Sequence, residues 1–429
     1  MSDGQTTDRS AIEADQIDRL RALIDRLIPG NLFWNRRLEA AGLDARCPDL
    51  TTFRKLPLLE KQELVEDHQA HPPFGTNLTD PLETYCRIHH TSGTTAAPLH
   101  WPDTAESWQW MLESWKKVFA AADVGPADSL FFAFSFGPFL GFWTAFEAAT
   151  QIGALCLSGG GMSTVQRLEA MQRARSTVLC CTPTYAIHLS QTARSEKIRP
   201  EDLALRKIVV AGEPGGSVEA VRRVIGEGLG AEVFDHHGMT EVGPVTYQCP
   251  GRPGILRVIE TAYLAEVIDP ETGLPIEAGR EGELVLSTLG RSACPLLRYR
   301  TGDRVRPVYL NETGDKPGPH LCLEGGILGR ADDMVIVRGV NVYPAAVDQV
   351  VRDTGGVAEY RVLVGRRGAM AELKIEIEPK PEADGEQVAR RLTAALQKAM
   401  SLRIPVEPVR PGSLPRFEMK ARRWVQSNA

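Results

Sequence analysis

Several features are missing from this sequence of 429 residues, and each absence excludes a class of protein. No uninterrupted apolar run approaches the roughly 20 residues that a membrane-spanning helix needs, so we expect no membrane partner. The formal net charge is -6, which offers no positive field to nucleic acid or to an anionic membrane surface. The first residues, MSDGQTTDRS, are polar and not those of a secretory leader. We therefore expect a cytoplasmic protein without a nucleic-acid partner.

Paired cysteine motifs are also absent. The eight cysteines are scattered and none forms a C-x-x-C pair. Cys180 and Cys181 lie in the apolar run TVLCCTP, which is typical of buried free thiols. A cytosolic location makes a disulfide framework improbable. The Walker pattern G-x-x-x-x-G-K-[ST] is absent as well, so any phosphate site must use a different loop.

The order of apolar runs predicts an α/β protein with two domains. Between residues 84 and 260, strand-like runs at 129–136, 176–183 and 207–212 alternate with helical patterns. This alternation favours a doubly wound, mostly parallel sheet. After residue 260, strands joined by turns predict an antiparallel β subdomain. We therefore predict a large N-terminal domain over 1–331 and a small, mobile α+β C-terminal domain over 332–429.

Five short stretches carry residues suited to nucleotide chemistry. Each has a plain alternative when it is taken alone: a polar turn, a solvated carboxylate or a solvated lysine. Backbone N–H groups and hydroxyls in a loop such as TSGTT can surround a phosphate. A carboxylate in DHHGMTEVGP can hold Mg²⁺, and one in LRYRTGDRV can accept ribose hydroxyls. The five stretches are TSGTT (91–95), DHHGMTEVGP (235–244), LRYRTGDRV (297–305), GRADDMVIVRG (329–339) and LPRFEMKARR (414–423).

Together and in this order, the five stretches are similar to the motifs of the adenylate-forming superfamily of acyl-CoA synthetases. The sequence most resembles the phenylacetate-CoA ligase family, from about residue 20 to 425. GRADDMVIVRGVNVYP resembles the hinge segment of that family almost throughout, and it is the most specific piece. The resemblance implies that a carboxylic acid attacks the α-phosphate of ATP, and that a thiol then displaces AMP from the acyl-adenylate.

The resemblance also implies roles for individual residues. Lys420, Thr240 and Glu241 would be catalytic, with Glu241 holding Mg²⁺ and Thr240 the α-phosphate. Lys420 would neutralise charge that grows in the transition state. The hinge would be Asp332. The remaining ATP-binding residues would be Thr91, Ser92, Gly93, Thr94 and Thr95 for the phosphates, Gly212, Glu213, Pro214 and His237 for adenine, and Asp303 and Arg330 for ribose.

An apolar pocket for the acid follows from the same resemblance. Small-molecule sites are mostly apolar with few polar groups, and an aromatic lining favours an aryl or arylacetic acid over a long fatty acid. Each phenylalanine could instead belong to the core. The expected pocket residues are Phe136, Phe139, Gly141, Phe142, Tyr185, Gly212 and His236.

Two departures from the family pattern affect ATP and metal binding. Ala96 and Ala97 stand where the phosphate loop usually carries glycine and lysine, so we expect weak ATP affinity and neutralisation by Mg²⁺ and by cations outside the loop. Cys249, His320 and Cys322 are candidates for the zinc site of some relatives. Their spacing lacks a clear fourth ligand, so we do not expect bound zinc.

The sequence leaves three hypotheses for function. The first is an ATP-dependent aryl-acid ligase that uses coenzyme A, with Mg²⁺ as metal. The second transfers the acyl group to the phosphopantetheine thiol of a carrier protein. The third is a non-catalytic acyl- or nucleotide-binding module, suggested by Ala96 and Ala97. A homodimer is implied by the resemblance alone.

Overall fold

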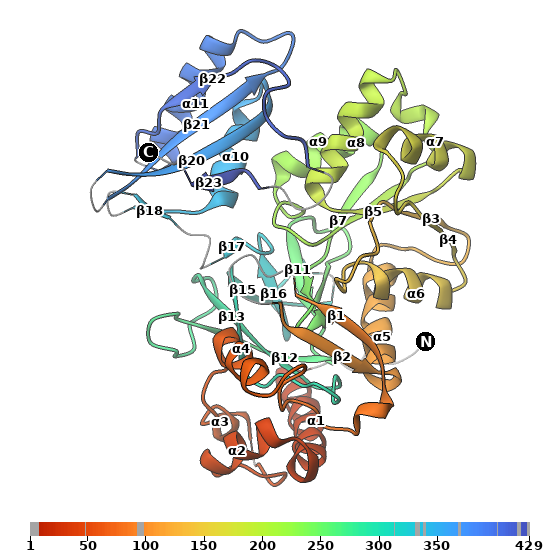
Figure 1. Cartoon of the computed structure of the whole chain (residues 1–429), viewed down its shortest axis with the longest axis vertical. Coiled ribbons are helices and arrows are strands. Elements are labelled where there is room, and N and C mark those ends of the chain that lie inside the picture. Colours follow the sequence, from red (N-terminus) through yellow and green to blue (C-terminus); the bar gives the residue numbers. More distant parts are fainter. Residues whose placement is uncertain are drawn as a thin grey trace.

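The fold is that of a computed structural model, which describes residues 8–47, 49–91, 98–312, 314–330, 335–337, 340–367, 370–400, 402–417 and 422–426. Four helices at the N-terminus pack together at one end of the molecule (Figure 1): α1 (Arg9–Gly30), α2 (Leu32–Ala40), α3 (Leu50–Phe53) and α4 (Lys61–Ala70). Asn31 begins α2, where its side chain accepts a hydrogen bond from the Trp34 amide. Apolar residues of these helices share a core with the antiparallel strands described below.

A hairpin and a long helix follow. Strands β1 (Tyr85–His90) and β2 (His100–Thr104) pair antiparallel, after the short 3-10 helix Leu82–Thr84. Helix α5 (Ala105–Ala121) begins where the Thr104 hydroxyl accepts from the Ser107 amide. Residues 92–97, which connect β1 to β2 in the sequence, lie outside the described residues.

The predicted parallel sheet is confirmed. Its five strands run in the order β4-β3-β5-β6-β7 with every neighbouring pair parallel. The strands are β3 (Ser129–Phe132), β4 (Leu155–Ser158), β5 (Val178–Cys181), β6 (Lys207–Val210) and β7 (Glu232–Asp235), and the helices between them are α6 (Trp143–Gln151), α7 (Thr164–Ala174), α8 (Pro183–Ser195) and α9 (Glu219–Leu229).

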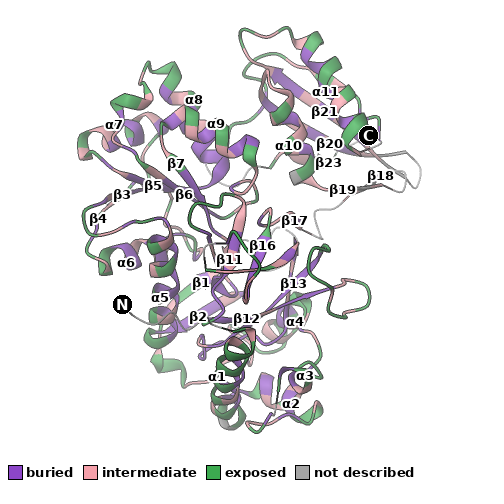
Figure 2. Cartoon of the chain, turned by 180° about the vertical axis from the view of Figure 1, so that it is seen from behind, coloured by how far each residue is buried: buried purple, intermediate pink, exposed green. Residues whose placement is uncertain are grey.

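Alternating side chains bury both faces of this sheet. Leu130 and Phe132 join a core with α5 and α6, whereas Phe131 between them joins a core with α7, α8 and α9. Figure 2 shows the resulting buried strands between exposed helix faces. Strand β3 is shorter than the predicted 129–136, because the Phe134 amide turns back to the Phe132 carbonyl and Phe136 has a φ of +50°.

The antiparallel subdomain predicted after residue 260 is confirmed, and it begins slightly earlier in the chain. Two four-stranded sheets have the orders β10-β11-β16-β15 and β12-β13-β14-β17, and β8 pairs with β9. Strand β14 runs through Asp303 to Val305, and a register irregularity between Glu283 and Val285 of β13 accommodates Gly302, whose φ is +75°. The strands are β8 (Gly238–Met239), β9 (Gly243–Pro244), β10 (Thr246–Gln248), β11 (Ile255–Val258), β12 (Tyr263–Ile268), β13 (Gly282–Thr288), β14 (Tyr299–Val305), β15 (Pro307–Leu310), β16 (His320–Glu324) and β17 (Gly329–Arg330).

The C-terminal part has its own sheet and its own hydrophobic core. The sheet has the order β22-β21-β20-β23, and a hairpin of β18 and β19 precedes it. The predicted boundary at Asp332 lies outside the described residues, so it stays a prediction. The elements are β18 (Val335–Val337), β19 (Val340–Val342), α10 (Pro344–Thr354), β20 (Val357–Arg367), β21 (Met370–Pro379), α11 (Gly385–Met400), β22 (Val406–Pro408) and β23 (Trp424–Gln426).

Within the described ranges, no helix is both long and apolar enough to cross a bilayer.

A buried histidine in β1 makes the fold sensitive to acid. His89 is 7% exposed and its ring stacks on Trp108 with 5.3 Å between ring centroids, and its Nδ1 has no hydrogen-bond partner among the described residues. Burial lowers the pKa of His89 from 6.5 to about 4.

We predict that His89→Phe flattens the loss of stability in acid. Below pH 6.5 His89 takes up a proton in the unfolded chain but not in the folded one. The free energy of unfolding therefore falls by up to ~1.4 kcal/mol for each unit by which the pH drops, down to about pH 4. Phenylalanine keeps the ring on Trp108 and removes this term. Urea unfolding at pH 7, 6 and 5 measures the slope, and an unchanged slope in the variant contradicts the prediction.

Candidate active site

The candidate active site begins at the carboxyl edge of the parallel sheet, where the loops after β5, β6 and β7 meet. After β6, Gly212 has a φ of +93°, a backbone conformation that residues with a side chain rarely adopt. The next residue, Glu213, accepts a hydrogen bond through Oε1 from the Thr184 amide at the start of α8, at 2.7 Å. This contact fixes the Gly212–Glu213–Pro214 segment against the loop after β5.

Three residues expected to bind adenine and ribose lie in direct contact. His237 follows β7, and its Nε2 is 2.9 Å from Oδ2 of Asp303 in β14. The other carboxylate oxygen of Asp303 accepts from Nη1 of Arg330 in β17 at 3.3 Å. Asp303 is 4% exposed, so its charge is compensated by these neighbours and not by water. The fold thus joins residues that are 93 positions apart in the sequence, from 237 to 330.

Thr240 and Glu241 occupy the turn between β8 and β9. Glu241 is 7% exposed, and its Oε1 is 3.0 Å from the ammonium of Lys61, the first residue of α4. The Lys61 side chain is 44% exposed, so the ammonium borders on solvent. A nearly buried carboxylate therefore faces an accessible cation at the position expected for the metal ligand.

A fully buried ion pair holds this turn against the phosphate-loop hairpin. Arg291 donates through Nε and Nη2 to both carboxylate oxygens of Asp103 in β2, at 2.8 and 2.6 Å, and neither side chain is exposed. Its Nη1 donates to the backbone carbonyls of Thr240 and Glu241, at 2.7 and 3.0 Å. One guanidinium thus links two loops that both belong to the candidate site.

Thr91, the first residue of the predicted phosphate loop, closes the base of that loop. It is 3% exposed, its amide donates to the Leu99 carbonyl and its hydroxyl accepts from the Leu99 amide, both at 3.0 Å. Ser92, Gly93, Thr94, Thr95, Ala96 and Ala97 lie outside the described residues, as do Asp332 and Lys420. Their roles stay predictions.

Three residues of the expected acid pocket, Phe136, Phe142 and His236, lie in one group of rings, which we call the aromatic cluster. Its ring contacts include Phe134–Phe142 at 5.5 Å and Phe136–Trp143 at 4.9 Å between centroids. Gly141 lies against it, since a β-carbon at this position would be 2.2 Å from the Phe134 ring. The aromatic cluster consists of Trp115, Phe132, Phe134, Phe136, Phe142, Trp143, Phe146 and His236.

His236 is the polar member of the aromatic cluster. Its ring centroid is 4.3 Å from that of Trp115, and its Nδ1 is 2.6 Å from the Thr246 carbonyl. Burial lowers the pKa of His236 to about 3, so the imidazole is neutral at physiological pH and donates from Nδ1 to the carbonyl. The cluster therefore carries no positive charge of its own.

Tyr185 and Phe139 are placed differently from the cluster. Tyr185 is fully buried in the core on the other face of the sheet, where its hydroxyl donates to Thr164 and the Arg167 guanidinium covers its ring. We expected it to line the pocket, but helix α8 turns its side chain away from the aromatic cluster. Phe139 is half-buried.

The zinc candidates do not gather into a metal site. The thiols of Cys249 and Cys322 hydrogen bond to each other, whereas His320 is 2.7 Å from a carboxylate oxygen of Glu312. Among the described residues, no group of three or more His, Cys, Asp or Glu side chains is arranged to hold a metal ion.

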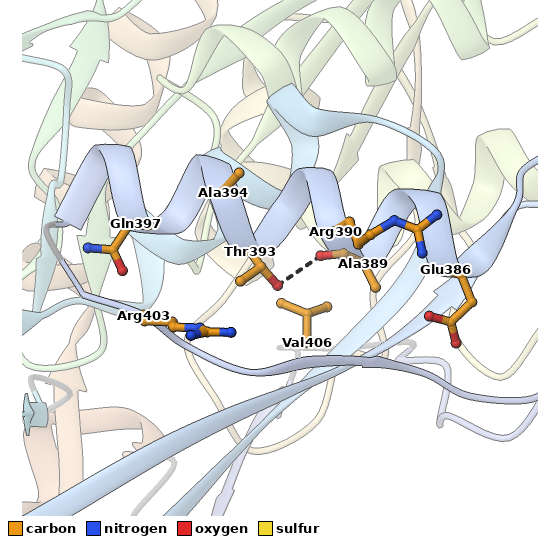
Figure 3. Close-up of a pocket in the computed structure, with 8 residues that line it drawn as sticks. All are labelled: Glu386, Ala389, Arg390, Thr393, Ala394, Gln397, Arg403 and Val406. Atoms are coloured by element: carbon orange, nitrogen blue, oxygen red, sulfur yellow. Dashed lines mark hydrogen bonds between the residues drawn. The ribbon is translucent and has the colours of Figure 1, made fainter.

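One hollow lies away from all these residues. It has a volume of about 390 Å³ on the C-terminal part, between α11 and β22, where Arg390 and Arg403 flank it (Figure 3). A smaller cavity of about 100 Å³ lies between α8 and α9 on one side and α10 and β20 on the other. No residue predicted for the site lines either of them.

Sequence patterns missed Lys61, Asp103 and Arg291. Asp103 lies just beyond the phosphate loop, but an acidic residue there looks unsuited to a phosphate site. Arg291 precedes the ribose motif in TLGRSA, and only the fold reveals that its charge is buried. Lys61 had no motif at all, because its partner Glu241 is 180 residues away.

Comparison with known proteins identifies the family. Residues 35–291 match the AMP-binding enzyme family, and residues 339–427 match the AMP-binding enzyme C-terminal domain. The phenylacetate-coenzyme A ligase of Thermus thermophilus is 32% identical over 436 aligned positions, which cover 96% of each chain.

Solved structures give the same answer for the whole chain. The 2-hydroxyisobutyryl-CoA ligase in its postadenylation state has a TM-score of 0.92 at 27% identity, covering 99% of this chain and 91% of that one. The same ligase in its thioesterification state, with coenzyme A bound, has a TM-score of 0.72 at 28% identity, covering 97% and 90%.

We predict that Arg291→Met lowers the free energy of unfolding by about 3 to 5 kcal/mol, because Asp103 is left charged and buried. The double variant Arg291→Met/Asp103→Leu should be more stable than the single one. The control is Arg257→Met, whose partner Glu312 is 69% exposed and which should cost less than about 1 kcal/mol. Urea unfolding measures all three, and equal losses for Arg291→Met and the control disprove the prediction.

Proposed function

The chain belongs to the AMP-binding enzyme family and is an AMP-forming acid–CoA ligase, and from that premise we propose that its acid substrate is aromatic, a benzoate or an arylacetate. ATP and coenzyme A are the co-substrates of this reaction. The acid becomes an acyl-adenylate with release of pyrophosphate, and the thiol of coenzyme A then displaces AMP.

The aromatic cluster carries this proposal. Flat rings and neutral His236 offer an apolar surface beside the Gly212 loop, where a substrate ring can stack and its carboxylate can face the nucleotide. Phe134 packs so closely on Gly141 that a bulkier residue there would displace it. Such a lining favours a flat ring over a long flexible chain.

In the proposed adenylation step, a carboxylate oxygen of the acid attacks the α-phosphorus and pyrophosphate leaves. The acid is already ionised at neutral pH, so the step needs no general base. Asp303 and Arg330 would hold the ribose, His237 and the Gly212–Glu213–Pro214 segment the adenine, and Thr91–Thr95 the phosphates. Thr240 and Lys420 would bind the oxygens on which negative charge develops.

Glu241 would hold Mg²⁺, and its setting fits that role. It is a nearly buried carboxylate that already faces a cation, and Mg²⁺ binds through one or two carboxylates together with phosphates. Mg²⁺ held there would supply positive charge beside the phosphates of ATP. The rigid backbone of this turn, fixed by Arg291, keeps the carboxylate in place without rearrangement.

Lys61 would supply the cation that the phosphate loop lacks at Ala97. Its ammonium reaches Glu241 from α4 and is exposed enough to turn towards an entering phosphate. This placement supports the proposal that neutralising charge comes from outside the loop. Because Lys61 belongs to α4 and not to the loop, a different element of the fold would supply the positive charge beside ATP.

In the proposed second step, the thiolate of coenzyme A attacks the acyl carbon and AMP leaves. A turn of the C-terminal domain at Asp332 would withdraw Lys420 and admit the thiol. A carrier-protein thiol would undergo the same chemistry, and it is distinguished by offering each thiol to the preformed adenylate.

We predict that acid-dependent exchange of pyrophosphate into ATP is at least tenfold faster with benzoates or arylacetates than with 2-hydroxyisobutyrate. The reason is that only an aromatic acid gains stacking energy in the aromatic cluster. Equal or faster exchange with the short hydroxy acid overturns the aromatic substrate. No exchange with any acid of a broad panel of aryl acids would instead favour the non-catalytic binding module.

We further predict that Lys61→Met raises the KM for ATP about tenfold, equivalent to the loss of one partly exposed charge contact of about 1.4 kcal/mol. Adding Ala97→Lys, with or without Ala96→Gly, should lower the KM again by restoring a cation near the phosphates. Steady-state kinetics at saturating acid and Mg²⁺ measure both variants. An unchanged KM in Lys61→Met contradicts the role of this lysine.

A further inference from the structure

Arg423 lies three residues after Lys420 and is held firmly within the C-terminal part. Its Nε and Nη2 donate to the two carboxylate oxygens of Glu359 in β20, at 2.6 and 3.1 Å. Its guanidinium also lies over the Tyr360 ring, 5.1 Å from the centroid. Both side chains of the ion pair are at most 10% exposed, so the pair is rigid and largely shielded from water.

The same guanidinium reaches the large domain. The Nη1 of Arg423 is 3.4 Å from the hydroxyl of Thr184, the second residue of α8. The Thr184 amide in turn donates to Glu213 in the segment expected to line adenine. Arg423 is therefore one contact away from the nucleotide segment on one side, and three residues from Lys420 on the other.

A second contact lies on the same face of α8. Gln191, seven residues beyond Thr184 and so two helical turns along, donates to the Ala358 carbonyl at 3.3 Å. Ala358 precedes Glu359, the partner of Arg423. Figures 1 and 2 both show α9 beside the C-terminal part, and the cavity of about 100 Å³, which Gln191 and Glu359 help to line, lies between the two surfaces next to these contacts. The boundary is thus sparsely bonded, and Arg423 is one of its few polar contacts among the described residues.

We propose that Arg423 is a positioning residue for adenylation: it seats the C-terminal domain on α8, next to the Gly212–Glu213–Pro214 segment, in the arrangement that the adenylation step uses. The proposal rests on the role proposed above for Lys420. Three residues of chain span at most about 11 Å, so the position of Arg423 constrains that of Lys420 closely. The arrangement of the two domains also matches the ligase structure in its postadenylation state better than the one in its thioesterification state.

The strengths of the contacts of Arg423 suit a C-terminal domain that must move away from α8 between the two half-reactions. The bidentate ion pair lies wholly inside the C-terminal part and travels with it. The contact that Arg423 makes across the boundary is a single long hydrogen bond to a neutral hydroxyl. Breaking this bond in every turnover costs little free energy. Arg423 can therefore hold the C-terminal domain in the arrangement for adenylation without preventing its move to the arrangement for thioester formation.

The test measures the two half-reactions separately, in the full-length enzyme, with an acid that the wild type accepts. Arg423→Met should slow acid-dependent pyrophosphate exchange at least tenfold. Thioester formation from supplied acyl-adenylate and coenzyme A should change less than threefold. Arg423→Lys should recover part of the exchange rate. Thr184→Val, which removes only the contact across the boundary, should slow exchange about threefold and leave the thioester step unchanged.

Arg361→Met is the matched control, because Arg361 pairs with Glu376 on the same sheet and is 36% exposed. It should leave both half-reactions unchanged. Equal losses in both half-reactions of Arg423→Met, or no loss in either, overturn the proposal. If Arg423→Met does not fold, Arg423→Lys and Thr184→Val decide by the same criterion.

Lys420→Ala serves as the reference for a selective loss of exchange. A wild type that accepts only non-aromatic acids overturns the aromatic substrate but leaves this test intact. A Lys420→Ala variant without selective loss overturns the role of Lys420 itself. Selective loss in Lys420→Ala without selective loss in Arg423→Met overturns the role of Arg423 alone.

Discussion

The buried ion pair between Asp103 and Arg291 is the constraint on which the candidate site depends. Two charges without solvent exposure are tolerated only when their hydrogen-bonding groups are satisfied. Arg291 uses its remaining nitrogen on the carbonyls of Thr240 and Glu241, so the pair cannot form unless the turn between β8 and β9 lies against β2. The geometry that satisfies the charges is therefore also the geometry that brings the phosphate-loop hairpin to the expected metal ligand.

Charge is distributed around this pair in a way that suits a polyanionic ligand. Glu241 and Asp303 are nearly buried carboxylates, and each faces a partner on a separate element, Lys61 on α4 and Arg330 on β17. The cations are more exposed than the carboxylates they compensate. They can therefore reorient towards phosphates while the carboxylates stay fixed, so the loop itself need not supply the positive charge.

The aromatic cluster shows how one set of residues serves packing and recognition together. Its rings fill the space between α5, α6 and the parallel sheet, and they also border the loops at the carboxyl edge. Phe136, four residues after the end of β3, adopts a left-handed backbone conformation. His236 stays neutral among these rings because burial opposes its charge.

The sequence by itself determined the architecture and the residue types of the site. Alternating runs predicted the parallel sheet and the antiparallel subdomain, since periodicity is a property of short segments. The motifs predicted nucleotide-binding roles for His237, Asp303 and Arg330, and the fold brings these three residues into contact. The sequence could not show that Tyr185 is buried on the other face of the sheet, because which face of α8 is buried depends on α7 and the sheet. Only the tertiary structure decided that Lys61 meets Glu241, that Arg291 joins two loops and that Arg423 touches Thr184. Each of these contacts joins residues at least 50 positions apart, and long-range pairing of single charges leaves no periodic trace in the chain.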